Sequence, residues 1–440
     1  MNNLIKLIIE KKIFILNTVL LTFFLKFISS SGVIIFNITI LFLSDKNILG
    51  LFTIGLSILT FSSIISRIGL NSAIIRFTSI TIHEKKTLQF KNEIVFSFLF
   101  SIFTSFIIFM LIIIFEDFIV YNIYKNEQLR KVIFLFALSI PLYSIILIQK
   151  SLFNSFRYSQ LVSVSDLGTV LLITTIIAII SEYLIGINLT IYRLCIYFLI
   201  SNLILILFLS IILINLILSK FIEKFETRSF SIDSVFVKSL PNYFLIDLSN
   251  YFFIWGTIFI ASFLLNSIDL ATFSTIFLLA LSLNFISITL NSIFSPILSV
   301  KFKKDDYEGL FKKIHDYRNI SLFINVPIIA FSLFFAEEIL FFIFDNSSNV
   351  DILIFRLLII THCLKIFSGP LILLYNLIGR EIFIRNLSLI TVIIHLSLIT
   401  CFSYFSTSSK IIISISYFIT LFVKYLIINI SYMKFKKDFI

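Results

Sequence analysis

Residues 194–218 read LCIYFLISNLILILFLSIILINLIL, a run of 25 residues without one charged side chain. About 20 apolar residues in a helix span the hydrocarbon core of a bilayer, so this run predicts a transmembrane helix. Eleven similar stretches accompany it, at 23–43, 50–70, 94–115, 132–149, 161–180, 241–264, 271–298, 320–336, 352–375, 386–405 and 411–431. The sequence therefore predicts an all-α integral membrane protein with twelve transmembrane helices, and it excludes a soluble enzyme.

The composition agrees with this class. Hydrophobic residues make up 59% of the 440 residues and charged residues only 13%, whereas a soluble domain carries about 25% charged residues. Glycine is scarce, with 10 residues against 55 phenylalanines, so close contacts between helices through small residues should be few. Cys195, Cys363 and Cys401 lie in apolar stretches without C-x-x-C spacing, and we expect small buried side chains there, not a disulfide or metal site.

Lysine and arginine mark one side of the membrane. Of the 35 basic residues, 24 lie in the two tails and in the connections that begin at 71, 150, 219, 299 and 376, and only six lie in the alternate connections. The positive-inside rule therefore places both termini in the cytoplasm. The net charge of +11 is a topology signal and a contact for anionic membrane lipids, and its distribution argues against a nucleic-acid partner.

The chain divides into two halves of six stretches each. Leu49-Gly50-Leu51-Phe52-Thr53 aligns with Leu270-Ala271-Thr272-Phe273-Ser274 at an offset of 221 residues, and both segments open the second stretch of a half. Six spans per half give parallel repeats, which is a transporter architecture. We predict two pseudo-symmetric six-helix lobes, 1–220 and 221–440. Residues 1–22 are expected to be a retained interfacial amphipathic segment, with a cleaved signal peptide as the alternative.

Every proline lies in or at an apolar stretch, where the missing hydrogen bond bends a helix. These residues are either fixed kinks or hinges for motion of the lobes. They are Pro141, Pro241, Pro296, Pro327 and Pro370.

Charged side chains at membrane depth cost at least ~2.5–3.5 kcal/mol near the bilayer centre, so they indicate a partner or a wet cavity. Asp247 and Lys365 lie deep in their stretches, where a cavity role and a structural ion pair are equally open. Asp166 is a weaker candidate, because Ser165 and Gly168 suggest a helix start.

Three other cations have simpler explanations. Arg67 and Arg356 lie near the ends of their stretches, and Lys424 lies about two helical turns from one. Their long side chains are expected to reach the interface.

Polar residues at helical spacing extend this pattern. Four stretches each carry a polar stripe that would line a shared cleft, although similar stripes also arise from ordinary interhelical hydrogen bonds. The stripes are Lys26, Ser30 and Asn37; Thr53, Ser57, Thr60 and Arg67; Tyr243, Asp247, Asn250 and Tyr251; and Asn284, Ser287, Asn291 and Ser295. His362 and His395 lie near mid-span, as proton relays or as neutral side chains bonded to backbone.

The chain contains no Walker loop and no G-x-G-x-x-G segment. Its longest connection on the outer side, 116–131, has 16 residues and is too small for a catalytic domain. Any energy for transport must therefore come from an ion or substrate gradient.

Several segments together resemble one family. Leu49-Gly50-Leu51-Phe52 opens stretch 2, and Arg67-Ile68-Gly69-Leu70-Asn71-Ser72-Ala73-Ile74-Ile75-Arg76-Phe77 ends it. Ser239-Leu240-Pro241 and Ser295-Pro296-Ile297-Leu298 also fit. With the length and layout of the whole chain, they resemble the O-antigen (polysaccharide-repeat) flippases of the multidrug/oligosaccharidyl-lipid/polysaccharide exporter (MOP) superfamily. At the position of the second half that aligns with Gly50, many members of this family have a glycine, whereas this chain has Ala271.

The resemblance implies two six-helix bundles of the MATE/MOP type around a cationic cavity lined by helices 1, 2, 7 and 8. It implies that a polyprenyl-pyrophosphate-linked oligosaccharide moves from the inner to the outer leaflet of a bacterial plasma (inner) membrane, toward polysaccharide polymerase machinery and lipopolysaccharide. It also implies coupling to H⁺ or Na⁺ in some members, with no other cofactor.

We therefore expect alternating access and a specific set of cavity residues. The cations would attract the pyrophosphate and the amides would bond sugar hydroxyls. Asp247 would pair with Lys26 or carry the coupling ion, for which Asp166 is a second candidate. The cavity set is Lys26, Arg67, Asp247, Asn250, Asn284, Asn291 and Lys365.

Three alternatives remain open at this point. A cation-coupled multidrug exporter has the same fold. A membrane polysaccharide polymerase or ligase would need a larger outer loop. A membrane scaffold without transport activity would not explain why charged side chains lie within the apolar stretches.

Overall fold

The computed structural model describes residues 2–84, 86–221, 233–345, 348–403 and 408–439. Within these ranges the secondary structure is helical and contains no strand. Two compact units divide the chain, Met1–Leu248 (unit 1) and Ser249–Ile440 (unit 2). The prediction of an all-α membrane protein built from two lobes is confirmed.

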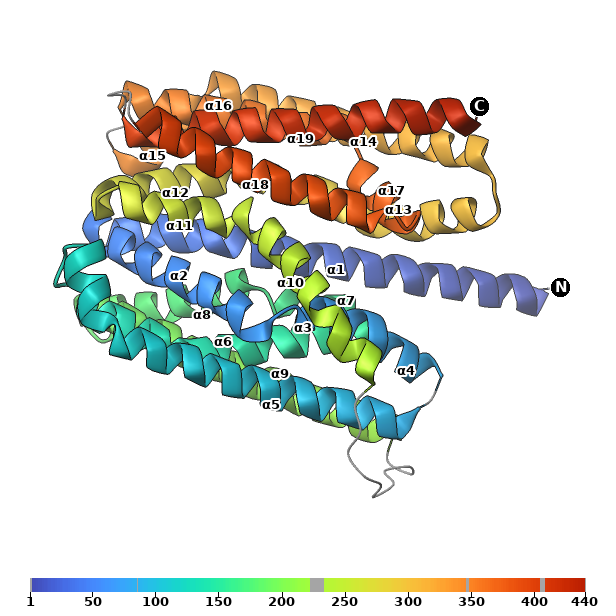
Figure 1. Ribbon diagram of the computed structural model, residues 1–440, viewed down its shortest axis with the longest axis horizontal. Helices are drawn as coiled ribbons and strands as arrows, with labels where there is room; N and C mark the ends of the chain where they lie inside the picture. Colours follow the sequence, from blue (N-terminus) through green and yellow to red (C-terminus); the bar gives the residue numbers. More distant parts are fainter. Residues whose placement is uncertain (1, 85, 222–232, 346–347, 404–407, 440) are drawn as a thin grey trace. The chain divides into compact units, whose positions relative to one another are not determined.

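Unit 1 has α6 at its centre. This helix packs against α2, α5 and α9, while α1 packs along α8 (Figure 1). The elements, in which η marks a π-helical turn, are α1 (Asn2–Leu43), α2 (Lys46–Arg67), α3 (Leu70–Ala73), η1 (Ile74–Thr78), α4 (Ser79–His83), α5 (Thr87–Ile114), η2 (Phe118–Ile123), α6 (Leu129–Ser155), α7 (Ser159–Val164), α8 (Leu167–Ile179), η3 (Ile180–Leu184) and α9 (Ile191–Phe221).

Unit 2 is built around α16 and α19. These two helices pack together, and α12, α14 and α18 pack against one or the other of them. The elements are α11 (Trp255–Leu264), α12 (Ser267–Ser282), α13 (Phe285–Lys303), α14 (Tyr307–Phe334), α15 (Ala336–Phe344), α16 (Asn349–Ser368), α17 (Leu371–Leu377), α18 (Glu381–Ser403) and α19 (Ser409–Phe439). The remaining helix, α10 (Ser234–Phe252), begins in unit 1 and ends in unit 2.

The described residues contain ten helical segments that are long and apolar enough to cross a bilayer. Two further spans are bent pairs: α10 with α11, at 61°, and α16 with α17, at 45°. Counting each pair as one span gives the twelve spans predicted from the apolar stretches.

The sharpest bend occurs without a proline. It lies between α10 and α11, where the hydroxyl of Thr257 donates to the carbonyl of Phe252 at 3.0 Å and that of Tyr417 donates to the carbonyl of Phe253 at 2.9 Å. Side chains thus satisfy carbonyls that the broken helix leaves unpaired, as a membrane interior demands. Pro241 lies inside α10, before this bend.

Only one proline lies at a break of more than 40°. Pro370 follows Gly369, whose φ of +68° ends α16, and α17 starts directly after it. The other four prolines lie within helices, and the choice between fixed kinks and hinges stays a prediction for all five.

The abundant phenylalanine fills the core of unit 1. Phe52 packs against Phe36 at 4.9 Å between ring centroids, against Phe136 at 5.0 Å and against Phe198 at 5.6 Å. These four rings come from α1, α2, α6 and α9, so one cluster joins four spans. Gly55 gives Phe136 its space, because a Cβ there would lie 2.1 Å from the ring.

One small-residue contact that the sequence did not predict joins α1 to α8. A Cβ on Gly32 would lie 2.3 Å from the carbonyl oxygen of Gly168, and a Cβ on Gly168 would lie 1.7 Å from that of Ser29. The backbones therefore touch, which is possible only because neither residue has a side chain. We call this contact the Gly32–Gly168 seam.

The division between the units differs from the predicted boundary at 220/221. It falls between Leu248 and Ser249, because the first part of α10 packs on unit 1. There Phe236 contacts Phe77 at 5.6 Å between ring centroids, and a Cβ on Gly69 would lie 2.4 Å from the carbonyl oxygen of Leu240.

At the other end of unit 1, α1 is continuous from Asn2 to Leu43. Residues 2–22 are therefore not a separate element, and the interfacial position predicted for this segment stays a prediction.

Candidate functional site

Lys26 has a different partner from the one expected. Its ammonium donates to Asp166, and Lys150 donates to the other oxygen of the same carboxylate. The three side chains come from α1, α6 and the residue before α8, and Asp166 is 17% exposed. The predicted pair of Lys26 with Asp247 is thus wrong, because Lys26 pairs with Asp166 at the start of α8. Lys150, which the sequence places in a connection, binds the same carboxylate.

Asp166 is a poor candidate for ion coupling in this arrangement. Each of its two oxygens already accepts from an ammonium group, so a bound cation would have to displace a lysine. We interpret the cluster Lys26–Asp166–Lys150 as a clamp between α1, α6 and α8.

Asp247 lies on α10 and meets the start of α3. Its Oδ1 accepts from the hydroxyl of Ser72 at 2.9 Å, and it interacts electrostatically with Arg67. Among the described residues its Oδ2 has no hydrogen-bond partner. The side chain is half-buried, so this oxygen can take a proton or a small cation.

Arg67 is buried, with 4% of the residue exposed, and the expectation that it reaches the interface is wrong. Its Nε donates to the carbonyl of Ser63 at 2.7 Å, and its Nη1 has no hydrogen-bond partner within the described ranges. The cause is local: α2 ends here, with Ile68 at φ +41° and Gly69 at φ +80°. The chain turns away at these two residues, and the guanidinium stays beside the helix.

Unit 2 contains a second polar cluster in its interior. Asn284, between α12 and α13, approaches Nδ1 of His362 with its amide nitrogen at 2.8 Å. The Oδ1 of Asn284 and the Nε2 of His362 have no hydrogen-bond partner among the described side chains and backbone. His362 is therefore bonded to a side chain and not to backbone. The ring of Tyr417 lies 6.1 Å from that of His362 and 5.9 Å from that of His395, measured between ring centroids.

Two lysines lie in the same interior. The ammonium of Lys424 is 3.9 Å from the centre of the Phe253 ring, a cation–π contact, and this residue is only 5% exposed. Lys365, on α16, interacts electrostatically with both Lys424 and His362 and is half-buried. No carboxylate of the described part of the chain pairs with either ammonium. Lys424 is thus buried, and the expectation that it reaches the interface is wrong. Arg356 is exposed, and its position at the interface stays a prediction.

The two remaining amides of the predicted set are Asn291 and Asn250. Asn291 Oδ1 lies 3.0 Å from the hydroxyl of Tyr317, whose single proton is shared between this oxygen and the carbonyl of Ser287, also at 3.0 Å. Asn250, on α10, is exposed.

The described residues contain no group of three or more His, Cys, Asp or Glu side chains that could hold a metal ion.

Comparison with known proteins agrees with this architecture. Residues 42–348 match the family model described as polysaccharide biosynthesis protein. No curated protein sequence matches the chain at a significant level.

Solved structures with the same fold cover nearly the whole chain. An inward-facing multidrug resistance MATE transporter of the MOP superfamily is similar with a TM-score of 0.67 at 15% identity, over 94% of this chain and 95% of that one. An outward-facing MATE transporter gives 0.65 at 15% identity, over 96% of both chains. A MOP transporter from Pyrococcus furiosus, whose binding pocket is described as of reverse polarity, gives 0.63 at 14% identity, over 94% and 95%. The chain therefore has the MOP transporter fold and belongs to the polysaccharide biosynthesis protein family.

Proposed function

We propose that this protein is a flippase that moves a polyprenyl-pyrophosphate-linked oligosaccharide of the O-antigen type from the inner to the outer leaflet by alternating access. The family supplies the link to polysaccharide biosynthesis, and the fold is that of membrane transporters. We further propose a bacterial plasma membrane with both termini in the cytoplasm, and transfer of the cargo to a polysaccharide polymerase. No chemical step on the sugar is needed for this role.

The pair Lys365–Lys424 carries the proposal. Two ammonium groups that interact with each other and have no carboxylate partner make the interior of unit 2 attractive to an anion. A pyrophosphate provides the missing negative charge, and the neighbouring amide of Asn284 offers an unpaired acceptor for a hydroxyl. A cationic drug would be repelled by the same two lysines, so the multidrug exporter is the weaker hypothesis.

The test uses the full-length protein in lipid vesicles. A lipid-linked oligosaccharide with a fluorescent sugar is offered on one side, and accessibility to an added glycosidase or quencher reports its movement. We expect flipping of the lipid-linked sugar and no export of a cationic dye under the same gradients. Dye export without sugar movement would replace the flippase with the multidrug exporter.

Asp247 is expected to couple the movement to an ion gradient. Its free Oδ2 and its position beside Arg67 give it a site whose charge can be switched. In Asp247→Asn, we expect flipping that no longer responds to an imposed H⁺ or Na⁺ gradient, measured in the same vesicles. Glu84→Gln, which changes an exposed carboxylate of unit 1, should keep the response. A normal gradient response in the Asp247 variant would end the coupling role.

A further inference from the structure

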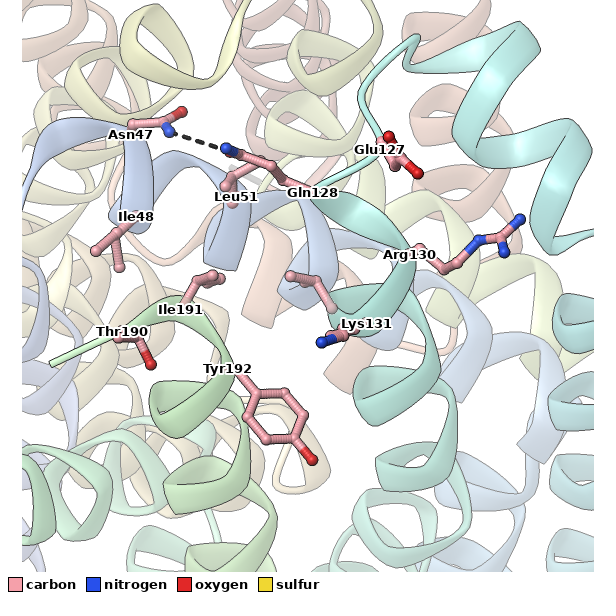
Figure 2. A pocket seen from close by; sticks show the side chains of 11 residues that line it. Asn47, Ile48, Leu51, Glu127, Gln128, Arg130, Lys131, Thr190, Ile191 and Tyr192 are labelled. Carbon is pink, nitrogen blue, oxygen red and sulfur yellow. Dashed lines mark hydrogen bonds between the residues drawn. The ribbon is translucent and has the colours of Figure 1, made fainter.

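A cavity of about 660 Å³ opens in unit 1, at the opposite end of α6 from Lys150. It lies where α2, α6 and α9 begin, and its wall includes Asn47, Gln128 and Tyr192 from these three places (Figure 2). A second cavity of about 380 Å³ shares the side chains of Arg130, Lys131 and Tyr192 with it. These volumes fall in the range of sites that hold small organic ligands.

The wall of this cavity, which we call the outer pocket, has a large apolar portion. Ile48 and Leu51 of α2 and Ile191 of α9 line it, and Tyr192 is 48% exposed. The ammonium of Lys131 lies 5.6 Å from the centre of this ring, so one face of the site combines an aromatic surface with a cation (Figure 2). Aromatic and aliphatic surfaces of this kind pack against the C–H faces of a sugar ring.

The polar groups of the outer pocket include both donors and acceptors. The amide nitrogen of Asn47 donates to Oε1 of Gln128 at 3.4 Å, a long bond that a ligand hydroxyl can replace (Figure 2). Glu127 and Thr190 offer acceptor oxygens, and Lys131 offers donors.

This mixture selects among ligand classes. A phosphate needs donors only, but Arg130 of the wall already donates to Asp117, and the carboxylate of Glu127 opposes a phosphate. A cationic drug is opposed by Lys131, whereas a hydroxyl-rich saccharide uses donors, acceptors and the apolar wall together.

Three connections between spans build the outer pocket, around 44–49, 116–131 and 181–193. They belong to the alternate connections, which together hold only six basic residues. The charge pattern predicts that this set faces away from the cytoplasm. We propose that the outer pocket is a saccharide-binding subsite that holds the glycan portion of the cargo after it has reached the outer side. This inference rests on the proposed function and names a site for its product.

Binding is tested with the full-length protein in lipid nanodiscs. The probe is the oligosaccharide released by mild acid from the lipid-linked substrate, and ligand-observed NMR gives the Kd. We expect Tyr192→Ala and Gln128→Ala to weaken binding at least ~10-fold, since each removes a surface or hydrogen bonds that the site devotes to its ligand. Tyr192→Phe, which keeps the ring, should bind like the wild type.

Matched controls lie on the same side of unit 1 but outside the pocket. Tyr183→Ala changes a tyrosine that is 73% exposed in η3, and Asn122→Ala changes an exposed amide in η2. Both should keep the wild-type Kd. Equal weakening in pocket and control variants overturns the inference, and so does displacement of the oligosaccharide by inorganic phosphate, which would indicate an anion site.

Flipping is measured on the same preparations. If the protein flips its cargo but the pocket variants bind the oligosaccharide as tightly as the wild type, this inference is overturned and the proposed function stands. Pocket-dependent binding by a wild-type protein that does not flip its cargo overturns the proposed function alone.

Discussion

Lys365→Met and Lys424→Met are each expected to reduce flipping of the lipid-linked oligosaccharide at least ~10-fold. Methionine keeps the apolar stem of lysine but removes the charge. In an interior shielded from water, loss of one charge opposite a bound anion costs about 2–5 kcal/mol of interaction, and 1.4 kcal/mol is a factor of ten. The initial rate of flipping in vesicles measures this directly.

The thermal midpoint of unfolding separates this effect from misfolding. An ammonium without a carboxylate partner destabilises an apolar interior, so both variants should unfold at the wild-type temperature or above it. Arg356→Met is the matched control, because Arg356 is an exposed cation on the same helix α16 as Lys365. Its flipping rate should be unchanged, and a Lys365 variant as active as this control would remove the anion-binding role.

Asp166→Ala is expected to lower the free energy of unfolding by roughly 3–5 kcal/mol. The carboxylate lies between the ammonium groups of Lys26 and Lys150, and its removal leaves two like charges together in a site that is largely shielded from water. Thermal unfolding of the detergent-solubilised protein, followed by size-exclusion chromatography, reports the loss.

A triple variant tests the cause. Lys26→Met/Asp166→Ala/Lys150→Met removes all three charges and should regain most of the stability, because the cost comes from unpaired charge and not from lost volume. Glu84→Gln, at the exposed pair of Glu84 with Lys86, should leave the midpoint unchanged. A triple variant as unstable as the single one would mean that Asp166 acts through the start of α8 instead.

The spans could be predicted because the thickness of the bilayer fixes their length, and each apolar stretch has to meet this requirement by itself. The bends could not. The break after Phe252 has no proline, and its carbonyls are satisfied by Thr257 and by Tyr417, which lies more than 160 residues further along the chain. Such a partner becomes visible only when the helices are packed.

The polar residues show the same limit. Asp247 and Lys365 lie within the helices of two bent spans, as their places in apolar stretches predict, whereas Asp166 directly precedes the span Leu167–Leu184. Their partners depend on the rotation of each helix about its axis, which a single sequence does not fix. For this reason Lys26 was predicted to pair with Asp247, whereas it pairs with Asp166. Lys424 was predicted to reach the interface, whereas its ammonium lies over the ring of Phe253.

The Gly32–Gly168 seam limits how the first and fifth spans can move. Interlocked backbones cannot slide along each other without first separating, and the nearest atoms leave no room for even a methyl group. Lys26 fastens the same two segments through Asp166, close to the seam. We therefore expect the two spans to move together in a transport cycle, with the flexible joints lying elsewhere in the chain.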